Sequence, residues 1–276
     1  MKHLPLVSCI MPTHNRRPFV GKAIEYFLRQ DYPDRELIIV DDGTDPIEDL
    51  APDDPRIRYL RQDHKRTIGA KRNLACKEAQ GEIIAHWDDD DWIAPWRLRY
   101  QVESLVKEQA DICGLDKLLF YDPKSGQAWQ YVYPERGRLW VAGGTLCYTK
   151  AFWKRNPFPD INVGEDTRFV WSNSSKKVLA LQNYTFYVAL IHPGNISPQR
   201  ASGNRWHSYP AGETRYLMGE DWNFYVAPSQ DGKAALVSAA SGIGDILRIT
   251  PLIRVFARLG YQVDVLLAPD YPKAIT

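Results

Sequence analysis

Short apolar runs alternate with segments of helical periodicity, and this alternation limits the folds that the chain can adopt. Residues 6–11 and 37–40 are apolar runs of strand length, whereas apolar positions between residues 19 and 28 recur at helical spacing. Because a crossover of this length joins parallel strands, the pattern predicts strand, helix and parallel strand. The expected fold class is therefore α/β, with an open, mostly parallel sheet flanked by helices.

The same alternation continues along the chain. A helix predicted over 69–80 lies between strands predicted over 57–60 and 82–87, and Pro95 opens a helix that ends near Lys107. Shorter strands are predicted at 111–115, 118–121, 127–133, 178–183 and 185–190. This region reads as one domain over residues 1–200.

Four consecutive aspartates, Asp88 to Asp91, follow the strand over 82–87 and concentrate negative charge at its carboxyl end. Mg²⁺ and similar ions take oxygen ligands and usually combine one or two carboxylates with substrate phosphates. A solvated acidic turn is the competing interpretation, because Asp is mostly exposed. The flanking residues Trp87 and Trp92 and the helix that follows favour a site for a metal ion and a diphosphate.

Polar residues also follow the first two strands, as residues 13–17 and as Asp41 and Asp42. In open α/β sheets, ligands bind beyond the carboxyl ends of the strands. We therefore expect these loops to form one site together with the aspartate run.

Charge and cysteine content exclude several classes of function. Lys and Arg number 35 against 34 Asp and Glu, which does not favour nucleic-acid binding. The four cysteines form no Cys-x-x-Cys pair, so neither a zinc site nor a disulfide framework is expected, and a cytoplasmic location fits best. No apolar run approaches the ~20 residues of a transmembrane segment.

The composition changes after residue 200. Residues 201–232 are rich in Pro, Gly, Ser, Arg and Trp, and are predicted to be a linker or an arm packed on the first domain. The expected contacts of this arm are Trp206, Tyr209, Tyr216 and Trp222.

Residues 233–276 predict one βαβ unit, with strands at 234–239 and 263–267 around a helix at 246–259. A single unit cannot cover both faces of its sheet, so we expect a truncated second domain and a longer natural protein.

Five motifs, in order, resemble the family-2 type of glycosyltransferase with the GT-A fold. They are Ile10 to Arg16, Leu37 to Gly43, Gly69 to Asn73, Asp88 to Asp91, and Gly164 to Asp166. The resemblance covers about residues 5 to 200 and implies a nucleotide sugar donor and a Mn²⁺ or Mg²⁺ cofactor. The usual Ala-Arg-Asn triplet is replaced here by Lys71-Arg72-Asn73.

This resemblance also implies roles for individual residues. Thr13, Asp41 and Arg72 would hold the nucleotide, Asp89 the ribose and Asp90 the metal, with the register of Asp90 counted back from Pro95. The predicted donor-binding set also includes the motif residues Asn15, Arg16, Asp42 and Asp88. Carboxylates accept hydrogen bonds from uracil or ribose, and Arg binds phosphate bidentately. For Asp41 the alternative is a turn former beside Gly43.

Asp166 resembles the family's general base, and Glu165 would orient it or contact the acceptor. The alternative is an acidic helix N-terminus, and the same triplet recurs at Gly219 to Asp221. His192 is predicted as a second metal ligand, with a structural role as the alternative. Imidazole suits Mn²⁺ better than Mg²⁺.

The segment from Ser241 to Leu252 resembles the start of family-9, heptosyltransferase-like GT-B enzymes. Its Gly-rich loop permits a tight strand-to-helix turn whose helix N-terminus faces an anion. On this resemblance, residues 233–276 would be an incomplete, inactive Rossmann-like domain.

Together these features predict a metal-dependent, inverting glycosyltransferase. The donor would be a nucleoside diphosphate sugar, a UDP-sugar by default, and the acceptor a hydroxyl of a glycan, lipid-linked or protein substrate. A nucleotidyltransferase is one alternative, although residues 12–17 lack the Gly-rich, Lys-bearing loop that it would normally carry. A non-catalytic carbohydrate-binding protein, using the aromatic side chains, is the other.

Overall fold

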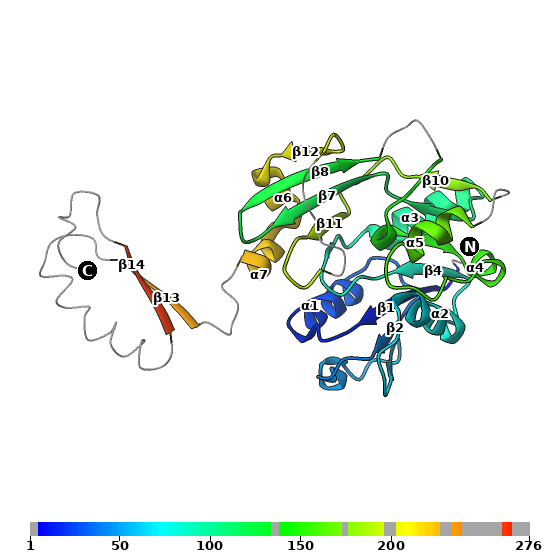
Figure 1. The fold of residues 1–276 in the computed structure, drawn as a ribbon, viewed down its shortest axis with the longest axis horizontal. Helices are drawn as coiled ribbons and strands as arrows, with labels where there is room; N and C mark the ends of the chain where they lie inside the picture. Colours follow the sequence, from blue (N-terminus) through cyan, green and yellow to red (C-terminus); the bar gives the residue numbers. More distant parts are fainter. Residues whose placement is uncertain are drawn as a thin grey trace, which may run out of the picture. The chain divides into compact units, whose positions relative to one another are not determined.

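The computed structural model describes residues 5–133, 138–172, 176–195, 203–226, 233–238 and 261–266. Internal contacts divide the chain into two units, residues 1–219 and residues 220–276 (Figure 1). The domain boundaries predicted at residues 200 and 232 stay predictions. Within the described residues, no helix combines the length and the apolar character needed to cross a membrane.

A seven-stranded sheet forms the centre of the first unit, in the order β10-β6-β9-β4-β1-β2-β3. Its strands are β1 (Val7–Thr13), β2 (Arg35–Asp41), β3 (Ile57–Arg61), β4 (Ile83–His86), β6 (Ile112–Gly114), β9 (Cys147–Thr149) and β10 (Val178–Ala180). Within this sheet β9 alone runs antiparallel to its neighbours. The predicted open, mostly parallel α/β sheet is confirmed.

Helices cover the central strands on both sides. The helices α1 (Arg17–Leu28) and α2 (Ile68–Glu78) lie on opposite sides of β1 and β2 (Figure 1). Apolar residues at helical spacing in α1, such as Val20, Ile24 and Phe27, are buried. The helix α3 (Arg97–Lys107) packs against β6 and β9. Burial on both faces explains why all seven residues of β2 are buried.

Strand register brings the ends of the parallel strands to one edge of the sheet. Thr13, the last residue of β1, pairs with Asp41, the last residue of β2. β4 ends before β1 does, because His86, the last residue of β4, pairs with Ile10 rather than with Thr13. The loops that follow β1 and β4 therefore begin close together.

Five further strands form a second sheet in the first unit, in the order β12-β8-β7-β11-β5. They are β5 (Trp92–Ile93), β7 (Lys117–Asp122), β8 (Gln127–Val132), β11 (Tyr187–Leu190) and β12 (Trp206–Tyr209). Most of these strands were predicted, but their assembly into a separate sheet was not. Other elements of the first unit are η1 (Glu48–Leu50), η2 (Gly143–Thr145), α4 (Lys150–Arg155) and α5 (Glu165–Trp171).

The segment after residue 202 contains regular structure that its composition did not predict. β12 pairs with β8, and the helix α6 (Ala211–Met218) packs against β7 and β8. Trp206 contacts the rings of Phe120 and Tyr131. The predicted packing of Tyr216 is wrong, because its side chain is 87% exposed. Thr214 and Met218 face the core from α6, and Tyr216 lies between them on the opposite side of the helix.

The second unit contains η3 (Gly219–Asp221) in part, α7 (Trp222–Val226), β13 (Lys233–Ser238) and β14 (Tyr261–Leu266). The two strands are parallel, with Lys233 paired to Tyr261. Parallel pairing agrees with the two strands of the predicted βαβ unit. The Gly-rich loop at 241–245 and the helix predicted over 246–259 lie outside the described residues.

Candidate active site

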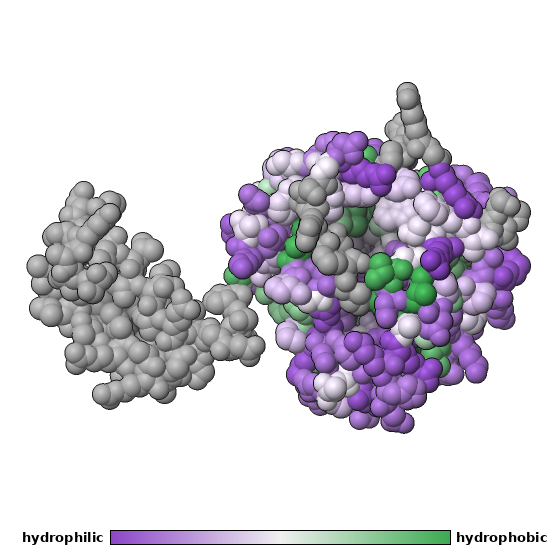
Figure 2. Space-filling view, viewed as in Figure 1, coloured by the Kyte–Doolittle hydropathy of each residue, from purple (hydrophilic) through white to green (hydrophobic). Residues whose placement is uncertain are grey.

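A cleft of about 1000 Å³ lies beyond the ends of β1 and β4 and is lined by residues of both sheets of the first unit. The face of this unit in the space-filling view is largely hydrophilic, with small hydrophobic groups beside its central hollow (Figure 2). The predicted site residues that line the cleft are Thr13, Asn15, Arg16, Arg72, Asp88, Asp89, Asp90, Glu165 and Asp166. Asp41, Asp42 and His192 are not among its lining residues.

The four aspartates of the run differ in their partners. The hydroxyl of Tyr187, on β11, donates to Asp91 and lies 3.1 Å from Oδ2 of Asp88. Asp91 also accepts a 2.8 Å hydrogen bond from the amide of Leu190. Burial, followed by the charge of Asp90, raises the pKa of Asp91 well above its ordinary value. The hydrogen bonds of Asp91 therefore connect β11 to the loop that contains Asp88 to Asp91.

Arg16 lies across the middle of the run. Its guanidinium is 4.0 Å from Asp89 and 3.6 Å from Asp90, and it donates to the carbonyl of Gly194. Burial, reinforced by the charge of Asp90, raises the pKa of Asp89 to about 8. In this structure Arg16 thus supplies part of the positive charge that the aspartate run requires.

His192 approaches Asp90 from the loop after β11, with 3.0 Å between Nε2 and Oδ2. The amide of Gly194 donates to Nδ1 at 3.1 Å, so Nδ1 is an acceptor and Nε2 faces the carboxylate. The imidazole also stacks on Phe19, with 4.7 Å between ring centroids. These contacts fix the ring so that Nε2 and the Asp90 oxygen point toward each other.

A divalent ion fits this donor pair. Nε2 of His192 and Oδ2 of Asp90 would be one nitrogen and one oxygen ligand, a combination that suits Mn²⁺. Ligation through Nε2 requires the tautomer with its proton on Nδ1, so the Gly194 amide would give up its hydrogen bond to Nδ1. Among the described residues, no three His, Cys, Asp or Glu side chains form a ready-made metal cage. Such an ion would take its other ligands from water and diphosphate oxygens, as Mg²⁺ usually does.

Arg72 connects the aspartate run to the candidate base segment. Its guanidinium forms an ion pair with Glu165 and lies 3.8 Å from Asp88. Burial acts to lower the pKa of Arg72, but Glu165 and Asp88 outweigh it and raise that pKa. Burial also raises the pKa of Glu165. Glu165 is 5% exposed at the start of α5, and it holds Arg72 in place within the cleft.

Asp166 and Asp88 both lie against the glycine pair Gly143-Gly144. A Cβ atom on Gly143 would lie 2.1 Å from Oδ2 of Asp166, and one on Gly144 would lie 2.3 Å from Oδ2 of Asp88. In the structure, the close approach is to two candidate site carboxylates, which any larger side chain would displace.

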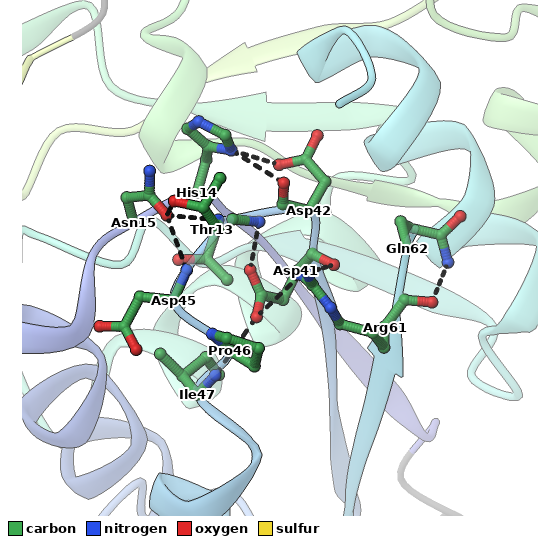
Figure 3. A network of polar contacts seen from close by, with 12 residues as sticks. Thr13, His14, Asn15, Asp41, Asp42, Asp45, Pro46, Ile47, Arg61 and Gln62 are labelled. Carbon is green, nitrogen blue, oxygen red and sulfur yellow. Dashed lines mark hydrogen bonds and ion pairs between the residues drawn. The ribbon is translucent and has the colours of Figure 1, made fainter. Parts of the chain in front are cut away.

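Asp41 and Asp42 bind other parts of the protein (Figure 3). Oδ1 of Asp41 accepts from the amide of Gly43, and Oδ2 accepts from the hydroxyl of Tyr59 at 2.7 Å. Asp42 pairs with Lys71 at 2.8 Å and lies 2.9 Å from His14. In this conformation both carboxylates form hydrogen bonds or ion pairs within the protein. A nucleotide-binding role for them stays a prediction.

Asn15 lies in the same network. It adopts a left-handed backbone conformation, with φ of 54°, which Asn tolerates better than most residues. Its Oδ1 accepts from the amides of Thr44 at 2.7 Å and Asp45 at 3.2 Å (Figure 3). Asn15 therefore holds the loop after β2 against the loop after β1.

Sequence reasoning missed three residues that organise the site. Tyr187 was read only as part of a strand, and no local pattern distinguishes it. Arg97 is fully buried and donates to the carbonyls of His86 and Gly144 at 2.8 and 2.9 Å. A charge among the inward positions of α3 was the available signal. Lys71, noted only as a departure from the family triplet, is the partner of Asp42.

Solved structures of similar architecture define the class of fold. The chain superposes on the mannosyltransferase PcManGT of Pyrobaculum calidifontis, solved with GDP-Man and Mn²⁺, with a TM-score of 0.55. The sequences are 16% identical, and the match covers 93% of this chain and 81% of that one. The first unit therefore has the GT-A fold.

The family model described as glycosyl transferase family 2 matches residues 8–156, and the chain belongs to this family. It is 47% identical over 202 residues to WcaA of Escherichia coli K12, assigned provisionally as a glycosyl transferase of colanic acid biosynthesis. That match covers 69% of this chain and 68% of WcaA. The prediction of a glycosyltransferase-type enzyme is confirmed at the level of the family.

Another relative is the Escherichia coli enzyme WfgD, named as a UDP-Glc:alpha-D-GlcNAc-diphosphoundecaprenol beta-1,3-glucosyltransferase. It is 35% identical over 106 residues, which cover 37% of this chain and 42% of WfgD. The chain thus spans less than half the length of this relative. The resemblance of residues 241–252 to family-9 enzymes stays a prediction.

Proposed function

We propose that the chain is a metal-dependent, inverting glycosyltransferase that moves a sugar from a nucleoside diphosphate sugar to an acceptor hydroxyl. One observation carries the proposal: a histidine–carboxylate pair, His192 and Asp90, lies beside the cleft that Asp166 lines. A metal-binding pair and a candidate base at one cleft are what transfer from a diphosphate requires.

Asp166 acts as the general base in this proposal. The acceptor hydroxyl transfers its proton to the Asp166 carboxylate while its oxygen forms a bond to the anomeric carbon. The bond from that carbon to the diphosphate oxygen breaks at the same time, and the electron pair leaves with the nucleoside diphosphate. Attack on the face opposite to the leaving group inverts the anomeric configuration.

Asp90 and His192 would hold Mn²⁺ or Mg²⁺, which neutralises charge on the departing diphosphate when bound. Arg72 and Arg16 line the same cleft and would contact phosphate oxygens. Asp89 and Asp88 would accept hydrogen bonds from the ribose and nearby donor groups. Thr13, at the end of β1, would contact the nucleotide.

Relatives support a nucleotide sugar donor without deciding the base. WfgD is named for UDP-Glc and the Pyrobaculum calidifontis structure contains GDP-Man. We keep a UDP-sugar as the default donor, and a glycan, lipid-linked or protein hydroxyl as the acceptor. WfgD is also named for a diphosphoundecaprenol-linked acceptor, which favours a lipid-linked glycan within this range. A cytoplasmic location stays a prediction.

Product analysis tests the proposal directly. The chain is incubated with Mn²⁺ and either UDP- and GDP-sugars with a glycan acceptor or nucleoside triphosphates with sugar phosphates. Release of nucleoside diphosphate, suppressed by EDTA and by Asp166→Asn, is expected. Glu103→Gln, an exposed carboxylate on α3, is the matched control and should behave as the wild type.

The alternatives predict other products. Release of pyrophosphate from the triphosphates would identify a nucleotidyltransferase. Glycan binding that EDTA leaves unchanged, with no nucleotide released under any condition, would identify a carbohydrate-binding protein.

A further inference from the structure

The candidate active-site cleft has two chemically different walls. One wall carries the aspartate run and cationic residues such as Arg16, Arg66 and Arg72. The other wall is uncharged, and we call it the aromatic wall. It consists of Leu118, Phe120, Tyr131, Trp140 and Trp206.

Strand register builds the aromatic wall. Leu118 on β7 pairs with Tyr131 on β8, and Tyr131 pairs with Trp206 on β12. Directly paired residues of neighbouring strands project from the same face of a sheet, so these three side chains form one row. The second sheet therefore turns one face toward the cleft.

The rings of the wall touch one another continuously. The ring centroids of Trp206 lie 4.6 Å from those of Phe120 and 5.3 Å from those of Tyr131. Tyr131 in turn lies 6.2 Å from Trp140. Phe120 is 7% exposed, and the larger rings beside it are half-buried, so the wall presents ring surface to the cleft.

The wall ends beside the candidate base. The indole N–H of Trp140 donates to the hydroxyl of Thr167 at 3.1 Å, and Thr167 directly follows Asp166. Tyr133 stacks on Trp140 with 4.9 Å between centroids and an interplanar angle of 24°. Trp140 is thus fixed at the junction between the aromatic surface and Asp166.

We propose that the aromatic wall binds a sugar ring of a glycan acceptor and presents its hydroxyl to Asp166. A pyranose ring has an apolar C–H face that packs on aromatic rings, and hydroxyls at its edge that remain free to react. A diphosphate would instead require the cations of the opposite wall. This inference rests on the proposed function, because it assigns the acceptor to the same cleft.

Trp206 is the residue of this wall that determines acceptor selectivity. It lies outside residues 8–156, the range matched by the family model. It also comes from the strand β12, which exists only because residues 206–209 pair with β8. The acceptor surface thus includes a segment that lies apart from the family motifs in the sequence.

Trp206→Leu removes the ring, and Trp206→Phe keeps a smaller one. Binding of cellobiose, lactose and chitobiose is measured by saturation-transfer NMR, and binding of UDP with Mn²⁺ by calorimetry. Trp206→Leu is expected to weaken disaccharide binding about tenfold, Trp206→Phe less, and neither to change UDP binding. The control is Trp96→Leu. Trp96 is half-buried, lies immediately before α3 and does not line the cleft.

Three results would overturn the inference. The first is that the wild type binds none of the disaccharides. The second is that Trp206→Leu weakens UDP binding, which would identify the wall as a pocket for the nucleotide base. The third is that farnesyl diphosphate competes fully with the disaccharides, which would identify the wall as a lipid-binding groove. Failure of the proposed function looks different: UDP and GDP would not bind the wild type, whereas Trp206-dependent disaccharide binding would persist.

Discussion

Nε2 of His192 lies 3.0 Å from Oδ2 of Asp90, although 102 residues separate the two in the sequence. The Gly194 amide donates to the other imidazole nitrogen and so directs Nε2 toward the carboxylate. In the free protein, Nε2 carries the proton of this hydrogen bond. As a metal ligand Nε2 would be unprotonated, with the proton on Nδ1 and the contact with the Gly194 amide broken.

Removal of either member of this pair tests the metal site. Asp90→Asn and His192→Gln are each expected to weaken Mn²⁺ binding in the presence of UDP by about 10- to 100-fold. Calorimetric titration of Mn²⁺ into protein saturated with UDP measures the change. His207→Gln, an exposed imidazole on β12, should have no effect. Wild-type Mn²⁺ affinity in the His192 variant would exclude this residue as a ligand.

Gly143→Ala is expected to lower the rate of transfer about 100-fold while the protein stays folded. The added Cβ would lie 2.1 Å from Oδ2 of Asp166, so the carboxylate or the backbone must move. A displacement of about 1 Å at a catalytic group costs roughly 100-fold in rate. Turnover and circular dichroism are compared with those of Gly21→Ala in α1, where a Cβ meets no atom within 4 Å. Unchanged turnover in Gly143→Ala would contradict the placement of Asp166 as the base.

Tyr187→Phe removes the hydroxyl that Asp88 and Asp91 share. The loss leaves a buried acceptor without its donor, and we expect a destabilisation of about 1–3 kcal/mol together with weaker binding of UDP and Mn²⁺. Urea unfolding and calorimetry measure the two effects. Tyr32→Phe loses one hydrogen bond, to the carbonyl of Pro5, and should change stability without changing UDP binding. Equal UDP affinity in both variants would show that Tyr187 does not position the run.

The Asp42–Lys71 pair predicts a pH-dependent contribution to stability. Burial acts to raise the pKa of Asp42, but the Arg66 amide and Lys71 outweigh it and hold that pKa below its ordinary value of 3.8. A depressed folded-state pKa means that the stabilisation is present above the ordinary value and is lost as pH falls through the folded-state value.

Asp42→Asn is therefore expected to lower the free energy of unfolding by about 3 kcal/mol at pH 7, because it leaves Lys71 buried without its charge partner. The difference from wild type should shrink below about pH 4, where the unfolded carboxylate is protonated. Urea titrations at several pH values measure it, with the exposed Asp53→Asn as control. A constant difference down to pH 3 would refute the linkage.

The aspartate run shows how far local sequence reasoning reaches. Its position after β4, and hence at the ligand-binding edge of the sheet, followed from the apolar strand before it. The sequence did not predict that the four aspartates have different partners. Asp90 faces His192, whereas Asp91 accepts hydrogen bonds from Tyr187 and from the Leu190 amide. Four identical side chains carry no local signal that separates them.

The regular structure of the arm after residue 202 could not be predicted for a related reason. Its composition predicted a linker or a packed arm and gave no sign of a strand, whereas residues 206–209 become β12 because β8 offers an unpaired edge. Strand formation there depends on a partner far away in the sequence rather than on local periodicity. The sequence therefore could not predict the aromatic wall, because the wall depends on the register of β7, β8 and β12.

The sequence by itself determined the alternating strands and helices, the parallel sheet and the edge at which polar loops gather. Helices buried on one side show apolar residues at helical spacing, and strands buried on both faces show continuous apolar runs. Only the tertiary structure decided which partner each carboxylate has. Lys71 and Tyr59 engage Asp42 and Asp41, and His192 selects Asp90. These pairings depend on hydrogen-bonding partners from distant segments of the chain, and no local periodicity of the sequence predicts them.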